Sequence, residues 1–489
     1  MSKSIEIAVR HEQLLVGGNW VDGGHGRFDV IDPATGDVVG TVADADDADV
    51  DAAVTAAERA FASWRHVPAR ERGRLLLRTA ELIRQRQDLI AQAMTSEQGK
   101  PLAEALGEVE SAASFFEWFG GEAERIYGQV VPPQQAHQRI LVLREPVGVA
   151  VAITPWNFPA AMLARKIAPA LAAGCTSIVK PASATPLTAV EIVRCLLDAG
   201  APAGTVNLIT SKRSAAVSRR LFDDARVRKL SFTGSTEVGK ELIRLSAENV
   251  TRLSLELGGH SPYVIFDDAD LDLAADQIIA SKFRNSGQTC VCANRAYVQR
   301  SAYEELLAKL AERTTKIVLG SGLDPKTTMG PLIDAAAGDK VAEHVRDAVD
   351  RGARVIAGGD RVEVDGLSGS FFAPTILADV TPGMVISYDE TFGPALAVAP
   401  FDTEDEAVEL ANSTPYGLAA YLHTRDYGRL LRVAERLDFG MVGVDTGLVS
   451  AANAPFSGVK ESGYGVEGGA FGIDEYLSTK YLLLGQVSA

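Results

Sequence analysis

Cysteine is scarce in this chain of 489 residues, which contains only Cys175, Cys195, Cys290 and Cys292. None of the four belongs to a Cys-x-x-Cys pair or to a Cys/His pattern with the spacing of metal ligands. The low count excludes a scaffold held together by disulfides and predicts a reducing compartment. We therefore expect no structural metal site.

A long uninterrupted hydrophobic run is also missing. Residues 146–164 approach the length of a membrane span, but Pro155 and Pro159 would break a helix in the middle of this stretch. The first residues, MSKSIEIAVRHEQLLVGG, contain Glu6 and Glu12 and have no apolar core before a cleavage site. We expect no membrane partner, no targeting segment and a cytoplasmic location.

Basic residues are fewer than acidic ones. The chain contains 48 Lys and Arg and 64 Asp and Glu, which gives a formal net charge of −16. An acidic surface repels phosphate backbones, so we expect no nucleic-acid partner. A local basic pocket remains compatible with this balance. At about 150 residues per domain, the length predicts about three structural units.

Strands and helices are expected to alternate twice along the chain. Residues 44–98 place apolar side chains at helical spacing. From about Val142, the β-branched runs VGVAVAIT, SIVK, VNLIT, KLSFTG and YVIF alternate with helical segments, and a second alternation begins near Leu271. This pattern is typical of βαβ units with parallel sheets. The glycines and proline of LSLELGGHSPYVIF mark a crossover between two α/β domains.

Two strand-like segments, residues 127–143 and 476–484, lie outside this alternation. They are expected to pair into a small separate sheet that two subunits can share.

Cys290 lies in FRNSGQTCVCAN, among small and polar neighbours rather than aliphatic ones. Such a setting suits an accessible cysteine, whose thiolate is a strong nucleophile. A free cysteine is, however, more often a small buried packing residue. This motif by itself leaves both interpretations open.

Three further motifs place polar groups where open α/β sheets build their sites. Asn157, in TPWNFP, follows an apolar strand and is a candidate donor to an oxyanion, although an asparagine can also simply satisfy a turn. Gly234 and Ser235, between a strand and a helix, suit a pyrophosphate, but the spacing is not G-x-G-x-x-G. Glu256, between leucines in LELGG, is a candidate general base if burial raises its pKa; otherwise it is a surface glutamate.

The motifs TPWNFP, KPAS, FTGS, LELGG, GQTC and DETFGP occur in this order. Together they resemble the NAD(P)-dependent aldehyde dehydrogenase superfamily over essentially the whole chain. The resemblance implies an α/β fold of two Rossmann-like open-sheet domains with a small β oligomerisation element, in a homodimer or homotetramer. We expect the cofactor-binding domain at residues 1–126 and 144–257, the catalytic domain at 258–469 and the oligomerisation element at 127–143 and 470–489.

The resemblance also implies catalytic roles. Cys290 would attack the aldehyde, while the amide of Asn157 and the backbone N–H of Cys290 would hold the oxyanion. Glu256 would activate the water that hydrolyses the resulting thioester. The branch of the superfamily that transfers its acyl group to coenzyme A lacks this base, so we expect release of a free acid.

Dinucleotide binding is implied for Trp156, Lys180, Ser183, Gly234, Ser235, Glu390 and Phe392. NAD-preferring members commonly have a glutamate at the position of Ser183. A serine there does not repel a 2′-phosphate, so we favour NADP, or use of both NADP and NAD. Arg213 would add positive charge near that phosphate, although a solvated surface arginine is the commoner situation.

Within the superfamily, RNxGQTCVC, WNFPxAMxxRK and GMVGVxxGLxS resemble the succinate-semialdehyde dehydrogenases most closely. This resemblance assigns the grip on a distal substrate carboxylate to Arg165, Arg284 and Ser450. A guanidinium fork suits a carboxylate, although a helical arginine often makes a structural ion pair instead. We expect oxidation of succinate semialdehyde. The alternatives are glutarate or 2-oxoglutarate semialdehyde with the same mechanism, and a non-catalytic dinucleotide-binding scaffold, which the complete catalytic set argues against.

Cys292 is a candidate redox residue. In the resembling family, a second cysteine two residues after the nucleophile can form a reversible disulfide with it. An inert packed thiol is the alternative.

Overall fold

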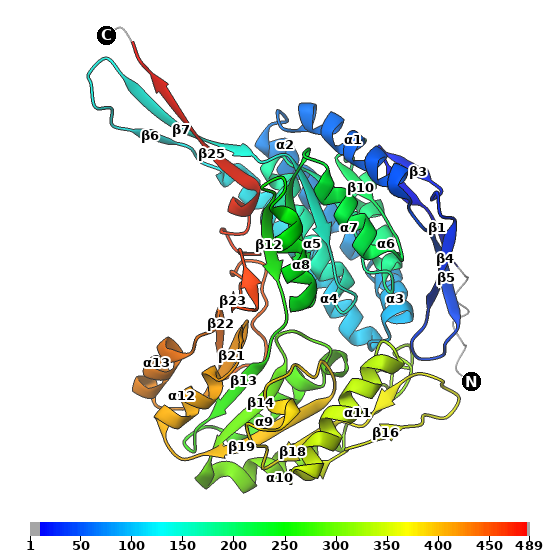
Figure 1. Ribbon diagram of the computed structural model, residues 1–489, viewed down its shortest axis with the longest axis vertical. Helices are drawn as coiled ribbons and strands as arrows, with labels where there is room; N and C mark the ends of the chain where they lie inside the picture. The colour runs from blue at the N-terminus through cyan, green and yellow to red at the C-terminus, as the bar shows by residue number, and fades with distance from the viewer. Residues whose placement is uncertain (1–9, 487–489) are drawn as a thin grey trace.

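The computed structural model describes residues 10–486 and contains two open α/β sheets, one above the other in Figure 1. A narrow β element projects from the upper part of the molecule. The predicted fold class, with two Rossmann-like sheets and a small β element, is confirmed. The assignment of a function to each domain stays a prediction. The part of the targeting prediction that rests on residues 1–9 lies outside the described residues.

The centre of the first sheet consists of five parallel strands in a Rossmann-type order. From β8 the chain continues to β9 and β10 on one side, and it then crosses back to β11 and β12 on the other side of β8. Antiparallel strands extend both edges. In spatial order the strands are β24 (Gly463–Tyr464), β12 (Arg252–Glu256), β11 (Val227–Thr233), β8 (Val149–Ile153), β9 (Thr176–Lys180), β10 (Val206–Leu208), β2 (Leu14–Val16) and β3 (Asn19–Val21).

The second sheet is parallel except for its edge strand β15. Its strands are β15 (Arg354–Ala357), β18 (Thr375–Ala378), β19 (Ala395–Phe401), β14 (Ala293–Gln299), β13 (Ser261–Ile265), β21 (Ala419–His423) and β22 (Met441–Val444). The chain passes from β12 of the first sheet to β13 of the second through Leu257–His260, where the breaker residues predicted a crossover.

Helices cover both faces of each sheet, as parallel strands require. The α-helices are α1 (Asp47–Trp64), α2 (Ala69–Gln85), α3 (Gln87–Gln98), α4 (Leu102–Glu122), α5 (Pro159–Ala173), α6 (Pro186–Asp198), α7 (Ser214–Asp223), α8 (Thr236–Ser246), α9 (Leu271–Lys282), α10 (Tyr303–Thr314), α11 (Ala335–Asp350), α12 (Glu404–Asn412) and α13 (Tyr427–Arg436). The short 3-10 helices are η1 (Ala123–Arg125), η2 (Arg284–Gly287), η3 (Arg300–Ala302), η4 (Val385–Ser387) and η5 (Asp474–Tyr476). Within residues 10–486, no helix has both the length and the apolar character needed to cross a membrane.

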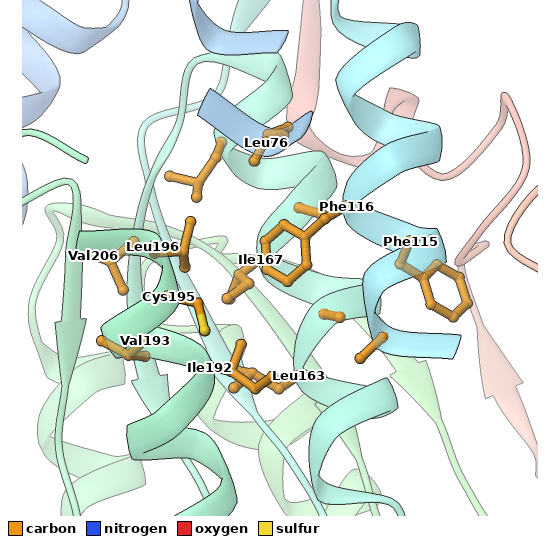
Figure 2. Packing of buried hydrophobic residues seen from close by; sticks show 14 of the residues in the cluster. Leu76, Phe115, Phe116, Leu163, Ile167, Ile192, Val193, Cys195, Leu196 and Val206 are labelled. Atoms are coloured by element: carbon orange, nitrogen blue, oxygen red, sulfur yellow. The ribbon is translucent and has the colours of Figure 1, made fainter. Parts of the chain in front are cut away.

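The largest apolar cluster lies between the first sheet and helices α2 to α6. Figure 2 shows Leu76 of α2, Phe116 of α4, Ile167 of α5 and Leu196 of α6 pointing toward one another. Helix α5 is buried along its whole length, and α4 packs against it. These two helices carry several of the charged residues described below, so core packing holds those charges in fixed positions.

The projecting element is the small antiparallel sheet that the sequence predicted. It joins β6 (Gln129–Val131) and β7 (Arg139–Pro146) to β25 (Leu477–Leu484). Exposed Tyr481, Leu482 and Leu483 lie on β25.

The N-terminal strands and helix α4 were not predicted. Strands β1 (Arg10–Glu12), β4 (Arg27–Ile31) and β5 (Val38–Ala43) form a three-stranded sheet. Short strands of this kind carry too few residues for a clear alternation pattern. Two-stranded pairs complete the fold: β16 (Arg361–Val362) with β17 (Phe371–Phe372), and β20 (Tyr416–Gly417) with β23 (Val459–Lys460).

Candidate active site

The first sheet changes strand order between β8 and β11, and the motifs singled out in the sequence gather at the carboxyl ends of these strands. Asn157 follows β8, and Gly234 follows β11. Open α/β sheets bind their ligands at such a switch point. Thr154 and Thr233, at the same strand ends, have buried hydroxyl groups with no hydrogen-bond partner among the described protein atoms. Polar groups are therefore left available to a ligand here.

Cys290 approaches this edge from the second sheet. Its loop begins with Asn285, Ser286 and Gly287, whose φ angles of 51°, 57° and 74° are all left-handed. A Cβ on Gly287 would lie 2.2 Å from the carbonyl oxygen of Gly393, and one on Gly259 would lie 2.2 Å from that of Cys290. Glycine thus allows three motifs, GQTC, TFGP and LELGG, to meet backbone against backbone.

The thiol of Cys290 is half-buried and lines a cavity of about 300 Å³. Burial raises its pKa to about 12; Glu390 adds to this shift, and Arg165 opposes it. In this state the sulfur is a neutral thiol, so its proton must leave before or during nucleophilic attack.

Asn157 is buried, and its amide faces the nucleophile loop. Its Nδ2 donates one hydrogen bond to the carbonyl oxygen of Gln288, at 2.9 Å, two residues before Cys290. The carbonyl oxygen of Asn157 accepts hydrogen bonds from Lys100 Nζ at 2.7 Å and from Asn285 Nδ2 at 3.0 Å. The second amide hydrogen of Asn157 remains to bind an oxyanion. The two hydrogen bonds to its carbonyl oxygen fix the backbone of this residue.

Glu256 ends β12 and pairs in register with Thr233 of β11. The side chain is buried, and neither carboxylate oxygen has a hydrogen-bond partner among the described protein atoms. Burial, reinforced by the nearby negative charge of Glu467, raises the pKa of Glu256 well above its usual value, against the effect of Lys166 and Arg165. The predicted desolvation of this carboxyl group is present.

The three residues predicted to grip a carboxylate converge on the cavity that contains Cys290. Arg165, Arg284 and Ser450 all line it. Arg165 Nη2 donates to Ser450 Oγ at 2.9 Å, and the guanidinium lies 4.0 Å above the ring centroid of Phe456. Its Nη1 also lies 3.8 Å from Glu467. Arg165 therefore also makes the structural ion pair that the sequence left open as an alternative, although the contact is long.

Both arginines keep unused donors. Nε and Nη1 of Arg165 and Nε of Arg284 are buried without a hydrogen-bond partner among the described protein atoms. A guanidinium with unused N–H groups in a cavity suits a bidentate anion.

The residues that the resemblance assigns to the adenosine side lie near the end of β9. Lys180 ends this strand, its Nζ donates to Ser214 Oγ at 2.7 Å, and burial lowers its pKa to about 8. Ser183 follows in a half-buried turn. Arg213, next to Ser214 in the chain, is exposed and donates to the carbonyl oxygen of Ala45 at 3.0 Å.

The structure also places the residues that the resemblance assigns to the pyrophosphate and the nicotinamide. Ser235 caps the N-terminus of α8, as expected for a phosphate-binding turn. Trp156 and Phe392 meet edge to face, with ring centroids 5.7 Å apart. Glu390 accepts a hydrogen bond from the backbone of Gly259 at 3.1 Å, and burial raises its pKa to about 7.

Cys292 is buried apart from the cavity wall. Its Sγ lies 3.6 Å from Lys282 Nζ and 3.4 Å from the carbonyl oxygen of Gly287, and all four cysteines are free thiols. Burial raises the pKa of this thiol, while Lys282 opposes the shift.

Several charged residues at the site were not identified from the sequence. Lys166 and Glu467 form a buried ion pair behind Glu256. Glu104 and Glu108 of α4 line the cavity. Composition offers no signal for these residues, because buried charges look like surface charges until the fold is known. Within residues 10–486, no group of three or more His, Cys, Asp or Glu side chains is placed to hold a metal ion.

Comparisons with known proteins agree with this architecture. Residues 20–482 match the model of the aldehyde dehydrogenase family. The chain is 49% identical to a glutarate-semialdehyde dehydrogenase of Pseudomonas putida and to a succinate-semialdehyde dehydrogenase (NADP(+)) of Escherichia coli, each covering 97% of this chain and 98% of the relative. The crystal structure of an aldehyde dehydrogenase from Brucella melitensis biovar abortus 2308 superposes with a TM-score of 0.95 at 49% identity, covering 98% of both chains. From the matching motifs, fold and full-length similarity, we conclude that the chain belongs to the aldehyde dehydrogenase family.

Proposed function

We propose that this protein oxidises a short semialdehyde with a distal carboxylate, succinate semialdehyde first, to the dicarboxylic acid. The observation that carries the proposal is that Cys290 shares one cavity with Arg165, Arg284 and Ser450. A nucleophile and unused guanidinium donors in one cavity match a molecule with an aldehyde and a carboxylate. The names of the two relatives support the same substrate class.

Glutarate semialdehyde is the second candidate, because a relative of equal identity is named for it. It is one carbon longer and carries the same two functional groups. The arginines can therefore serve either substrate, and chain-length preference depends on the apolar wall between them and Cys290.

In the proposed reaction the Cys290 thiol first gives its proton to solvent water, and the thiolate Sγ then attacks the aldehyde carbon. The carbonyl oxygen becomes an oxyanion, which the free amide hydrogen of Asn157 and the backbone N–H of Cys290 stabilise. A bound nicotinamide dinucleotide would supply the acceptor for the hydride that leaves this carbon, and loss of the hydride turns the Cys290 adduct into a thioester. Glu256 then takes a proton from water, and the hydroxide attacks the thioester carbon. The C–S bond breaks, the acid is released, and Glu256 returns its proton to the Cys290 sulfur.

The chain's own residues fit a dinucleotide along the edge of the first sheet. Lys180 and Ser183 would bind the adenosine ribose, Gly234 and Ser235 the pyrophosphate, and Glu390 the nicotinamide ribose (with Phe392 and Trp156 beside the ring). The orphaned hydroxyls of Thr154 and Thr233 support a polar ligand there. Because Ser183 has no charge to repel a 2′-phosphate, we propose NADP, or both NADP and NAD, and the NADP(+) in the name of the Escherichia coli relative agrees.

We further propose that the protein works as a homodimer or homotetramer in the cytoplasm. The small sheet of β6, β7 and β25 projects from the body of the molecule, and Tyr481, Leu482 and Leu483 on β25 are exposed, as an interface between copies would require. A small aldehyde is its other partner.

The deciding experiment measures kcat/KM for aldehydes of two to six carbons, with and without a terminal carboxylate, with NAD and with NADP. We expect succinate semialdehyde or glutarate semialdehyde to exceed the neutral aldehyde of equal length. Cys290→Ala should abolish formation of the reduced cofactor. Equal rates for charged and neutral aldehydes, or activity of Cys290→Ala close to that of the wild type, would refute the proposal.

A further inference from the structure

The substrate cavity contains a carboxylate that has no role in the proposed reaction. Glu104, on the first turn of α4, lines the same cavity as Arg165, Arg284 and Cys290. A negative charge in a cavity that receives an anion weakens binding, so its presence calls for a physical reason.

Glu104 is held in place rather than free in solvent. The side chain is half-buried, and its Oε2 accepts the backbone N–H of Asn285 at 2.8 Å. Asn285 directly follows Arg284 and has the left-handed φ of 51°. The carboxylate is therefore anchored to the turn that carries one of the two arginines.

The second acid in the wall, Glu108, is different because its charge is already compensated. It forms a buried ion pair with Lys100, and its Oε1 accepts the backbone N–H groups of Ala160 and Ala161 at 2.8 and 3.2 Å. These two groups lie at the N-terminus of α5. Glu108 thus anchors a helix end, and its charge is not available to the cavity.

The charges around the cavity add up to a small positive value. The cations are Arg165 and Arg284 in the cavity wall and Lys100, which pairs with Glu108; the carboxylates are Glu104 and Glu108. One net positive charge remains, which one substrate carboxylate neutralises.

We propose that Glu104 determines the charge specificity of the cavity: by offsetting one of the two arginines, it favours aldehydes with one negative charge over those with two. This inference rests on the proposed function, because it assumes that the arginines receive a substrate carboxylate.

The carboxyl group of Glu104 changes its ionisation state near neutral pH. Burial raises its pKa to about 7; Glu108 adds to the shift, whereas Lys100, Arg284 and the Asn285 N–H oppose it. Its charge therefore builds up as the pH rises through this value and is lost progressively below it. Charge specificity should follow the same change.

Glu104→Gln tests the idea, since the amide oxygen of glutamine still accepts the N–H of Asn285 while the charge is removed. We would measure kcat/KM at pH 8 for butanal, succinate semialdehyde and the dicarboxylated 2-(2-oxoethyl)succinate. The ratio of the doubly to the singly charged substrate should rise about tenfold in the variant, with butanal changed by less than about twofold. Glu110→Gln, which removes a charge from the same helix where Glu110 pairs with Arg84, is the matched control and should leave the ratio unchanged.

A second measurement needs no variant. In the wild type, the same ratio, calculated for the fully ionised form of each substrate, should fall as the pH rises from 6 to 8, and it should be flat in Glu104→Gln. An unchanged ratio in Glu104→Gln, or a flat wild-type profile, would overturn the inference. A wild type that does not prefer succinate semialdehyde to butanal would instead overturn the proposed function.

Discussion

Arg284→Ala is the sharpest test of the proposed carboxylate grip. Arg284 lines the cavity, lies 5.2 Å from the ring centroid of Phe158 and has a buried Nε without a partner among the described protein atoms. Arg165 is less suitable, because it packs over Phe456 and contacts Glu467, so its loss would also destabilise the fold.

The expected size of the effect follows from charge-assisted hydrogen bonding. Such a bond contributes about 1.5–3 kcal/mol, and about 1.4 kcal/mol corresponds to one factor of ten, so kcat/KM for succinate semialdehyde should fall about 10- to 100-fold. Most of the loss should be in KM, since Arg284 binds the end of the substrate away from Cys290. Butanal has no carboxylate, and its kcat/KM should change by less than about threefold.

The assay is initial-rate formation of reduced cofactor with both aldehydes, for the wild type, Arg284→Ala and Arg220→Ala. Arg220 is an exposed arginine paired with Asp51 and serves as the control for loss of one positive charge. Melting temperatures of all three proteins would show whether the fold is intact. An equal loss for the charged and the neutral aldehyde in Arg284→Ala would refute the reasoning, because a carboxylate grip cannot affect a substrate without a carboxylate.

The remaining predictions concern the base, the cofactor and the second cysteine. Glu256→Gln should retain one burst of reduced cofactor per active site and lose steady-state turnover; a normal steady state would contradict its role as the base for hydrolysis. Because burial raises the folded-state pKa of Glu256, its ionisation costs folding stability, so Glu256→Gln should melt higher than the wild type by a margin that grows with pH above the unfolded value. Ser183→Glu should lower kcat/KM with NADP by more than about tenfold relative to NAD, since a carboxylate repels the 2′-phosphate; an unchanged ratio would remove Ser183 from the cofactor site. After treatment with peroxide, dithiothreitol should restore the wild type more completely than Cys292→Ala, because a disulfide with Cys290 protects the nucleophile from further oxidation; equal recovery would assign Cys292 to packing against Lys282 alone.

The strands and helices of both sheets were largely predictable because their patterns are local. The β-branched run VGVAVAIT became β8, and residues 187–198 became most of α6. Strands β1 to β5 are mostly too short to show alternation, so the N-terminal sheet was missed. The pairing of β7 with β25 was expected because both segments lie outside the main alternation. The sequence alone did not indicate which residue of one strand lies opposite which residue of the other.

For the site, the sequence by itself determined the identity of the chemistry. Cys290, Glu256 and Asn157 could be singled out because each lies in a short motif whose residue types suit one step of the reaction. The tertiary structure decided which charges act together. Arg165 and Ser450 are far apart in the chain and meet at 2.9 Å, and Glu104 joins them in one cavity. Burial likewise raises the pKa of Cys290 and of Glu256. The cost of desolvating a charge depends on how completely the fold surrounds it. No local pattern of residues contains that information.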